Sequence, residues 1–408
     1  MKRETLKIVI IGHVDHGKST LIGRLLLDTN SLPEDKVDEI KKISKELGRE
    51  AELAFVADQL KEERERSITI DTTQIFFKTK RRDYVIIDAP GHVEFIKNML
   101  TGAAQAGAAI LIVDVNEGMK EQTRRHLYLV NMLGISDIIV LANKMDLINY
   151  DKEIFGRLKA ELLKFQDKLN LKVANFIPAS AKEGDNITRK SSNLKWYKGP
   201  SFLETLDRII SKRDDIKKPM RFPIQDIYTL EDSNIILGKV ASGVLKEGEP
   251  VEVYPEKKES RIKSIKVFNK MKYSAEKGES IGIILQDKHD IFRGHVVAEK
   301  DSGAECVDRF NGRIFWLSEE PLEVNKKMIL KCTTQEVPCS AESIRNRMNS
   351  STLDILEPNA KNLFCNEAGE VAFRTERPLV VEKYSYIQEL GRFTIESDKG
   401  VQAAGIII

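Results

Sequence analysis

The first half of the chain alternates short apolar runs with longer stretches in which apolar residues recur every three or four positions. Short continuous apolar runs are typical of strands that are buried on both faces. The predicted strands of this half span residues 7–11, 73–77, 84–87, 109–113, 137–141 and 173–177. The predicted helices lie between them, at residues 93–105, 120–133, 152–169 and 202–210. This alternation predicts an α/β fold with a doubly wound, mostly parallel sheet.

One segment of this half departs from the strand and helix alternation. Residues 33–66 are rich in Glu and Lys, and their apolar residues follow helical spacing in two groups. These are Val37, Ile40, Ile43 and Leu47, then Leu53, Val56 and Leu60. We interpret the segment as two amphipathic helices inserted into the α/β domain. Its charges favour a solvated face over a binding site.

The pattern changes at Lys217. From Phe222 onward the chain consists of short alternating segments, such as Val251–Tyr254, separated by turn signals such as Lys246–Glu249. Many short strands with regular turns predict small β-barrels. We therefore expect an α/β domain at residues 1–217, followed by two β-barrel domains at residues 218–302 and 303–408.

Composition and charge narrow the class of protein. The chain has 41% apolar and 31% charged residues, and its 65 basic and 63 acidic residues give a net charge of +2. This balance argues against an electrostatic nucleic-acid or membrane binder, although it leaves room for a local basic face. There is no apolar run of 18 residues and no space for a signal peptide before the first strand, so we expect a cytoplasmic protein. The four cysteines lack C-x-x-C spacing and are read as buried small residues.

A phosphate-binding loop follows the first predicted strand. Gly12, Gly17, Lys18 and Ser19 satisfy the pattern G-x-x-x-x-G-K-S, and a helical segment begins directly after them. Glycines let successive N–H groups point inward at an anion, and the helix N-terminus adds partial positive charge. Lys18 can reach the terminal phosphates, and the Ser19 hydroxyl is a hard oxygen ligand for Mg²⁺.

A second motif selects the base. Asn143-Lys-Met-Asp146 follows a predicted strand of the same domain. The Asp146 carboxylate can accept hydrogen bonds from both N1–H and the 2-amino group of guanine, whereas adenine offers neither donor there. Lys144 would lie along the base plane, and the backbone of Ser180 and Ala181 could meet the guanine carbonyl. The nucleotide is therefore predicted to be GTP.

Asp88-Ala-Pro-Gly91 and Thr69 supply the parts of a switch. Asp88 can hold Mg²⁺ through a water, and the Gly91 N–H can contact the γ-phosphate. Thr69 is a second hydroxyl ligand once its loop closes over GTP, so two loops depend on one phosphate. His92 can orient the attacking water.

The predicted site is therefore large. Its catalytic residues are Lys18, Thr69 and His92, and its Mg²⁺ ligands are Ser19, Thr69 and, through water, Asp88. The predicted GTP contacts are Gly12, His13, Val14, Asp15, His16, Gly17, Lys18, Ser19, Thr20, Asp88, Ala89, Pro90, Gly91, His92, Asn143, Lys144, Met145, Asp146, Ser180, Ala181 and Lys182. His13 and His16 occupy loop positions that need backbone rather than side chain.

These motifs together resemble the translation-factor GTPases, in the style of elongation factor Tu and elongation factor 1-alpha. The resemblance is carried by residues 12–20, 63–71, 88–92 and 143–146, and it covers essentially the whole chain. It implies a P-loop GTPase domain followed by two β-barrels, with GTP and Mg²⁺ bound to the first.

A narrower resemblance points to the GTPase subunit of bacterial sulfate adenylyltransferase. It is carried by residues 122–126, 143–150, 196–200, 221–225, 291–294 and, above all, 308–322. It implies that GTP hydrolysis drives ATP and sulfate toward adenylyl sulfate and pyrophosphate on a separate catalytic adenylyltransferase subunit, the expected partner.

Three positions depart from that subunit. His13-Val-Asp-His16 and Ala89 are as in the elongation factors, and Ser67 stands where the superfamily has glycine. Two alternatives therefore stay open beside the sulfate-activating subunit. One is an elongation-factor-like GTPase that delivers aminoacyl-tRNA or acts on the ribosome, and the other is a nucleotide-binding module without turnover.

Overall fold

The structure is a computed structural model, and it describes residues 5–32, 74–88, 106–135, 137–169, 171, 173–209, 217–230, 233–267, 270–287 and 289–408. The chain forms two compact units. Residues 1–211 with 350–353 form the first, and residues 212–349 with 354–408 form the second. The predicted insertion at residues 33–66 and the predicted helix at 93–105 lie outside the described residues.

The first unit is built on a six-stranded sheet in the order β2-β3-β1-β4-β5-β6. Its strands are β1 (Thr5–Ile11), β2 (Gln74–Lys78), β3 (Asp83–Asp88), β4 (Ala108–Asp114), β5 (Ile138–Asn143) and β6 (Val173–Pro178). Only β2 runs antiparallel to its neighbour, and the other four pairings are parallel. Parallel strands place their carboxyl ends at one edge, which is where such sheets bind ligands. The motifs that follow β1, β5 and β6 therefore meet at one edge, where β3 also ends.

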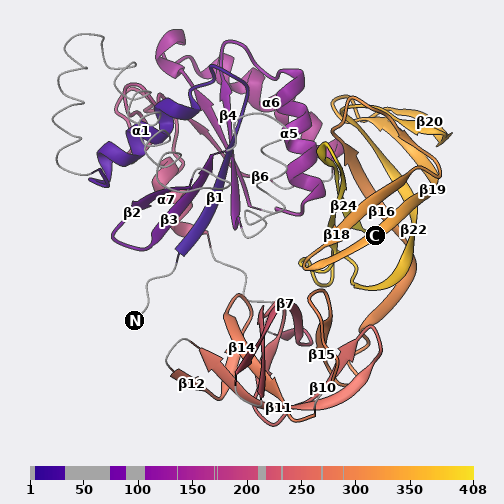
Figure 1. The fold of residues 1–408 in the computed structure, drawn as a ribbon. Coiled ribbons are helices and arrows are strands. Elements are labelled where there is room, and N and C mark those ends of the chain that lie inside the picture. Colours follow the sequence, from indigo (N-terminus) through magenta and orange to yellow (C-terminus); the bar gives the residue numbers. More distant parts are fainter. Residues whose placement is uncertain are drawn as a thin grey trace. The chain divides into compact units, whose positions relative to one another are not determined.

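The described helices of this unit cover both faces of the sheet. They are α1 (Lys18–Asp28), α5 (Glu121–Met132), α6 (Lys152–Lys168) and α7 (Phe202–Arg208). Helices α1 and α7 lie on one side of the sheet and α5 and α6 on the other (Figure 1). Asp151 caps α6 by accepting from the N–H groups of Glu153 and Ile154, and Ser201 and Glu204 form a capping box on α7.

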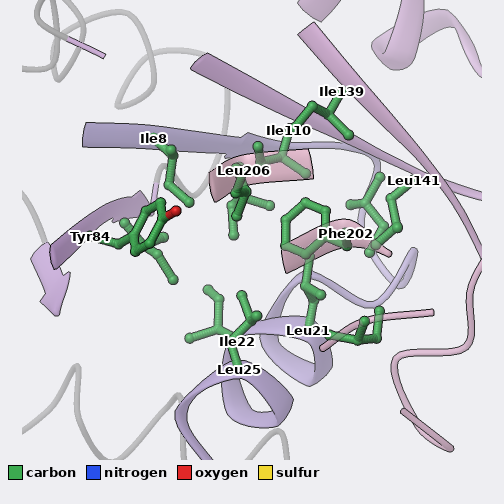
Figure 2. Packing of buried hydrophobic residues seen from close by; sticks show 14 of the residues in the cluster. Ile8, Leu21, Ile22, Leu25, Tyr84, Ile110, Ile139, Leu141, Phe202 and Leu206 are labelled. Carbon is green, nitrogen blue, oxygen red and sulfur yellow. The ribbon is translucent and has the colours of Figure 1, made fainter. Parts of the chain in front are cut away.

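One hydrophobic core joins α1 and α7 to the sheet. Figure 2 shows side chains of α1 and α7 directed toward alternate residues of the strands. These residues are Leu21, Ile22 and Leu25 from α1, Phe202 and Leu206 from α7, and Ile8, Tyr84, Ile110, Ile139 and Leu141 from the strands. All are essentially inaccessible to water. This packing fixes α1, and with it the loop that precedes it, against the edge where the motifs meet.

The second unit contains two closed β-barrels. The first barrel comprises β7 (Arg221–Leu230), β8 (Ser233–Lys239), β10 (Pro250–Tyr254), β11 (Lys258–Val267), β12 (Lys270–Lys272), β14 (Ser280–Leu285) and β15 (Val296–Glu299), with β9 (Val244–Lys246) and β13 (Ser274–Glu276) paired separately. The sheet order is β10-β15-β7-β8-β14-β11-β12, and an additional pairing of β10 with β11 closes it. Closure removes the exposed sheet edges.

The second barrel repeats this plan with longer strands. It comprises β16 (Glu305–Trp316), β18 (Lys327–Cys332), β19 (Gln335–Asn349), β20 (Ile355–Ala360), β22 (Glu367–Val381), β23 (Arg392–Ser397) and β24 (Gly400–Ile407), with β17 (Leu322–Glu323) and β21 (Asn362–Leu363) paired separately. The order is β18-β23-β24-β16-β22-β19-β20, closed by the pairing of β18 with β19. Strand β16 is hydrogen-bonded to β24 on one side and to β22 on the other.

The two barrels meet through a buried ion pair. The Arg221 guanidinium, at the start of β7, contacts the Glu382 carboxylate, which directly follows β22, at 2.8 Å. Arg221 also donates to the Ser302 hydroxyl at 2.8 Å and to the Met220 carbonyl at 3.1 Å. Its side chain is wholly buried, and an apolar cluster with members from both barrels adjoins it.

The predicted fold class, a P-loop GTPase domain with a doubly wound sheet followed by two β-barrels, is confirmed. The boundaries at residues 217 and 302 stay a prediction. Within the described part of the chain, no helix combines the length and the apolar character that a membrane crossing needs.

Candidate functional site

Two glycines of the phosphate-binding loop stand where no side chain fits. The loop connects β1 to α1. A Cβ atom on Gly12 would lie 2.4 Å from the Ile112 carbonyl oxygen, and one on Gly17 would lie 2.4 Å from Asn143 Nδ2. Gly17 also has φ +97°, a conformation that favours glycine. The spacing of the motif is therefore required by close contact with strands β4 and β5.

The next residues bring positive charge to the loop. The Lys18 ammonium donates to the carbonyl oxygens of Gly12 and His13, at 2.9 and 2.8 Å, so its charge is held across the loop. Ser19 lies in the first turn of α1, whose N-terminus carries no side-chain cap and no acidic residue. An uncapped helix start presents its N–H donors and partial positive charge to an anion. The geometry suits a bound phosphate group.

The variable positions of the loop are exposed or turned aside. Val14 is 61% exposed, and Asp15 has φ +64°. The ring of His13 is hydrogen-bonded through Nδ1 to the Gln122 side chain of α5. These side chains therefore shape the outside of the loop, as expected for positions that contribute backbone.

His16 lies inside the domain. Its side chain is wholly buried, with Nδ1 3.4 Å from the Ile112 carbonyl oxygen and Nε2 3.7 Å from the Glu117 carboxylate. Burial lowers the pKa of this imidazole, and it outweighs the opposing effects of the Ile112 carbonyl and Glu117. A neutral His16 ring avoids burying a cation in a loop that already carries the Lys18 ammonium.

Asn143 joins the two base-side loops to the phosphate loop. Its Nδ2 donates to the His16 carbonyl at 2.9 Å, and its Oδ1 accepts from the Ala181 N–H at 2.9 Å. The side chain is 2% exposed. Because the Ala181 N–H already donates to Asn143, a contact of that group with a guanine carbonyl would have to share it.

Lys144 is held by a residue that the sequence did not single out. Its ammonium lies 3.0 Å from the carboxylate of Asp114, which is 4% exposed and pairs in register with Asn143 across β4 and β5. The other Asp114 oxygen accepts from the Asn116 N–H at 2.8 Å. We expected Lys144 to lie along the base plane. In the structure its ammonium is paired with the Asp114 carboxylate.

Asp146 has the environment of a residue that lacks its ligand. It lies in the 3-10 helix Met145–Ile148, and its Oδ1 is buried without a hydrogen-bond donor among the described residues. A buried carboxylate oxygen without a donor is unfavourable unless something else supplies one. A pocket opens beside it, lined by Gly17, Thr20, Asn143, Lys144, Asp146, Leu147, Ser180 and Lys182. This arrangement fits a purine with two donors on one edge.

The structure brings the phosphate and base motifs together and leaves the switch undescribed. Thr69 and residues 89–92, including His92, lie outside the described residues. Asp88 ends β3 at the same sheet edge, but its side chain is not described. The proposed Mg²⁺ ligands are therefore represented by Ser19 alone, and no group of three or more metal-binding side chains occurs among the residues that the structure describes.

Sequence reasoning missed four residues that support these loops. Arg24 donates from α1 to the carbonyl oxygens of the Ala181 loop. The Tyr150 hydroxyl donates to Asp185 at 2.6 Å, and thus links the segment after Asp146 to the one after Ala181. The four residues are Arg24, Tyr150, Asp185 and Asp114. Of these, only Asp114 had a position in the sequence, at the end of an apolar run, that hinted at its role.

Comparison with known families assigns all three segments. Residues 3–212 match the family model of the elongation factor Tu GTP binding domain. Residues 234–298 match elongation factor Tu domain 2, and residues 309–408 match the GTP-eEF1A C-terminal domain-like family. The fold and the phosphate loop define a GTP-binding protein of the P-loop class with two appended barrels.

Full-length relatives make the family specific. The chain is 39% identical to elongation factor 1-alpha of Methanothermobacter thermautotrophicus, over 100% of this chain and 98% of that one. It is also 39% identical to elongation factor 1-alpha of Pyrococcus horikoshii, over 99% and 97%. The chain belongs to the translation elongation factor GTPase family. A solved structure of sup35 complexed with GDP aligns with 22% identity and a TM-score of 0.47.

The prediction of a sulfate adenylyltransferase subunit is wrong. The two relatives named above are elongation factors 1-alpha and align over nearly the whole chain, which also removes the predicted adenylyltransferase partner. The stretch 308–322 that suggested it is mostly strand β16, whose Phe315 and Trp316 are buried in the second unit. Such residues are set by packing and carry little information about a partner. The argument from net charge against nucleic acid does not decide the question, because an average over the chain does not describe a local face.

Proposed function

We propose that the chain is a GTP-hydrolysing elongation factor that delivers aminoacyl-tRNA to the ribosome. The observation that carries the proposal is the 39% identity to an elongation factor 1-alpha over 100% of the chain. It is supported by family models that match the GTP-binding segment and both barrel segments.

The described residues fit a guanine nucleotide at two points. On the phosphate side, Lys18, the uncapped start of α1 and the loop N–H groups would hold the β- and γ-phosphates. On the base side, the Asp146 carboxylate would accept from guanine N1–H and the 2-amino group, which would give its Oδ1 the donor that it lacks among the described residues. Asn143 would keep the two sides at a fixed separation, because it bonds to both.

The switch is proposed on sequence grounds. Ser19, Thr69 and, through water, Asp88 would hold Mg²⁺, which when bound neutralises charge on the phosphates. Gly91 would contact the γ-phosphate, and His92 would orient the attacking water. Loss of the γ-phosphate then releases the loops that carry Thr69 and Gly91, so the chain has a GTP form and a GDP form.

The proposal is tested by protection of aminoacyl-tRNA. We expect the chain with a non-hydrolysable GTP analogue to slow spontaneous deacylation of aminoacyl-tRNA at micromolar concentration, and the GDP form to do so at least about tenfold less well, which is about 1.4 kcal/mol. Deacylated tRNA should not compete, and Lys18→Ala should give no protection in either nucleotide.

Two results would contradict it. Absence of protection by the GTP form at low salt, where phosphate contacts are strongest, would remove the tRNA-carrier role. Bound GTP that is never hydrolysed, with or without ribosomes, would indicate a nucleotide-binding module without turnover.

A further inference from the structure

A buried arginine on the helix that follows the phosphate loop reaches the loop on the base side. Arg24 lies in the middle of α1 and is 7% exposed. Its Nε donates to the Ala181 carbonyl at 3.1 Å, and its Nη2 donates to the Lys182 carbonyl. Arginine is rarely buried unless it is paired. A buried guanidinium that donates to two successive carbonyl oxygens indicates a role in holding that backbone.

Together with the hydrogen bonds of Asn143, these contacts attach Ala181 both to the phosphate loop and to α1. Asn143 accepts from the Ala181 N–H and donates to the His16 carbonyl in the phosphate loop. Arg24 donates to the carbonyl of the same Ala181 and belongs to the helix that starts at Lys18. Ala181 is therefore fixed through its N–H by one motif and through its C=O by the phosphate helix.

Asp28, one turn further along α1, extends this attachment. One of its carboxylate oxygens lies 3.5 Å from Arg24 Nη1, and the other accepts from the Thr188 hydroxyl at 2.8 Å. Gly184, with φ +82°, lies against the Arg24 side chain, since a Cβ there would be 3.6 Å from it. Two further residues of the segment after Ala181, Gly184 and Thr188, thus lie against Arg24 and Asp28 of α1.

We propose that Arg24 is a positioning residue for guanine recognition, which sets the place of the Ala181–Lys182 backbone relative to the phosphate-binding end of α1. The proposal rests on the GTP site proposed above. Arg24 lies six residues after Lys18, or about 9 Å along a rigid helix. The helix therefore acts as a spacer between the groups that hold the phosphates and the backbone that faces the base carbonyl. A nucleotide whose base carbonyl lies at the matching distance from its phosphates can contact the N-terminus of α1 and the Ala181–Lys182 backbone at the same time.

The test separates base recognition from overall stability. Arg24→Lys keeps the positive charge but lacks the planar fork that donates to two carbonyls at once. We would measure affinity for GDP and for the diphosphate of 6-thioguanosine, which keeps N1–H and the 2-amino group but carries sulfur, a weak hydrogen-bond acceptor, in place of the 6-carbonyl oxygen. Arg24→Lys should weaken GDP about tenfold and change the 6-thioguanine nucleotide less than about twofold, equivalent to about 1.4 and 0.4 kcal/mol. Arg157→Lys, an exposed arginine on α6, is the matched control and should change neither.

Other outcomes overturn the inference. Equal loss for both nucleotides would make Arg24 a purely structural residue, and no change for either would leave it without a role in recognition. If Arg24→Lys does not fold, Asp28→Asn decides, because it keeps the guanidinium and removes the carboxylate beside it. A selective two- to threefold loss of GDP affinity in that variant supports the inference, and an unchanged ratio overturns it. A wild-type chain that binds no GDP would instead refute the proposed function itself.

Discussion

Replacing Asp146 by asparagine tests the base-reading argument directly. The carboxylate has a buried oxygen without a donor among the described residues, and guanine would supply two donors to the carboxylate. Hydrogen bonds to a charged group contribute about 1.5–3 kcal/mol each. Asparagine would turn an N–H toward one of these donors, so Asp146→Asn should lose about 3–6 kcal/mol of GDP affinity, or about 10²- to 10⁴-fold.

The same substitution should create a new preference. Xanthine carries a carbonyl where guanine has its 2-amino group, so the asparagine amide can donate there and still accept from N1–H. We expect xanthosine diphosphate to bind Asp146→Asn more tightly than GDP does, measured by competition for a labelled nucleotide. The nucleotide-free variant should melt no lower than the wild type, because a buried carboxylate oxygen without a donor is unfavourable.

Asp151→Asn is the matched control, since asparagine caps a helix about as well as aspartate. It should keep the guanine preference. An unchanged guanine preference in Asp146→Asn would refute the assignment of the base site.

Four further changes test neighbouring parts of the site. Lys18→Ala should abolish nucleotide binding in an equilibrium binding assay, because the loop loses its cation, and a variant that still turns over GTP would contradict this role. His92→Ala should slow single-turnover hydrolysis while GTP affinity is kept, and an equal loss of both would make His92 structural. Tyr150→Phe removes the hydroxyl that donates to Asp185 and should cost about 1–2 kcal/mol of unfolding free energy, with no added cost when Asp185→Ala is already present. Burial lowers the pKa of His16, so the unfolded chain takes up its proton first as the pH falls through about 6.5. Stability to urea should therefore drop more between pH 7.5 and 5.5 in the wild type than in His16→Gln.

Much of the α/β fold was readable in the sequence because parallel strands are buried on both faces. The run predicted at residues 109–113 is β4 (Ala108–Asp114), and the helix predicted at 152–169 is α6 (Lys152–Lys168). The barrels were predicted, but the strand pairings that close them were not. Closure depends on pairings such as β10 with β11 and β18 with β19, and local alternation does not specify which strands pair.

The candidate site was predictable only where a local motif defines it. Gly12 to Ser19 and Asn143 to Asp146 each form a continuous pattern, and the structure brings them to one edge. Arg24 looks like any arginine in a helix, and its role depends on a loop 157 residues away. Long-range hydrogen bonds of this kind leave no local signal.

The incorrect prediction of a sulfate adenylyltransferase subunit also has a structural explanation. Trp316 is buried and donates from Nε1 to the Glu320 carbonyl at 2.7 Å, and Trp196 donates to the Tyr150 carbonyl at 3.0 Å. Both lie in stretches that suggested sulfate activation. Side chains that hold the fold together in this way can identify the fold without identifying the partner.

The buried pair of Arg221 and Glu382 has a consequence for biosynthesis. The two residues are 161 positions apart, so the ribosome makes the first barrel long before the carboxylate that neutralises its arginine. During that interval the guanidinium must remain hydrated, and the apolar surface around it stays open. The two barrels therefore dock late in synthesis. A chain interrupted before Glu382 exposes the unpaired Arg221 and the apolar surface near it, which chaperones and proteases can recognise.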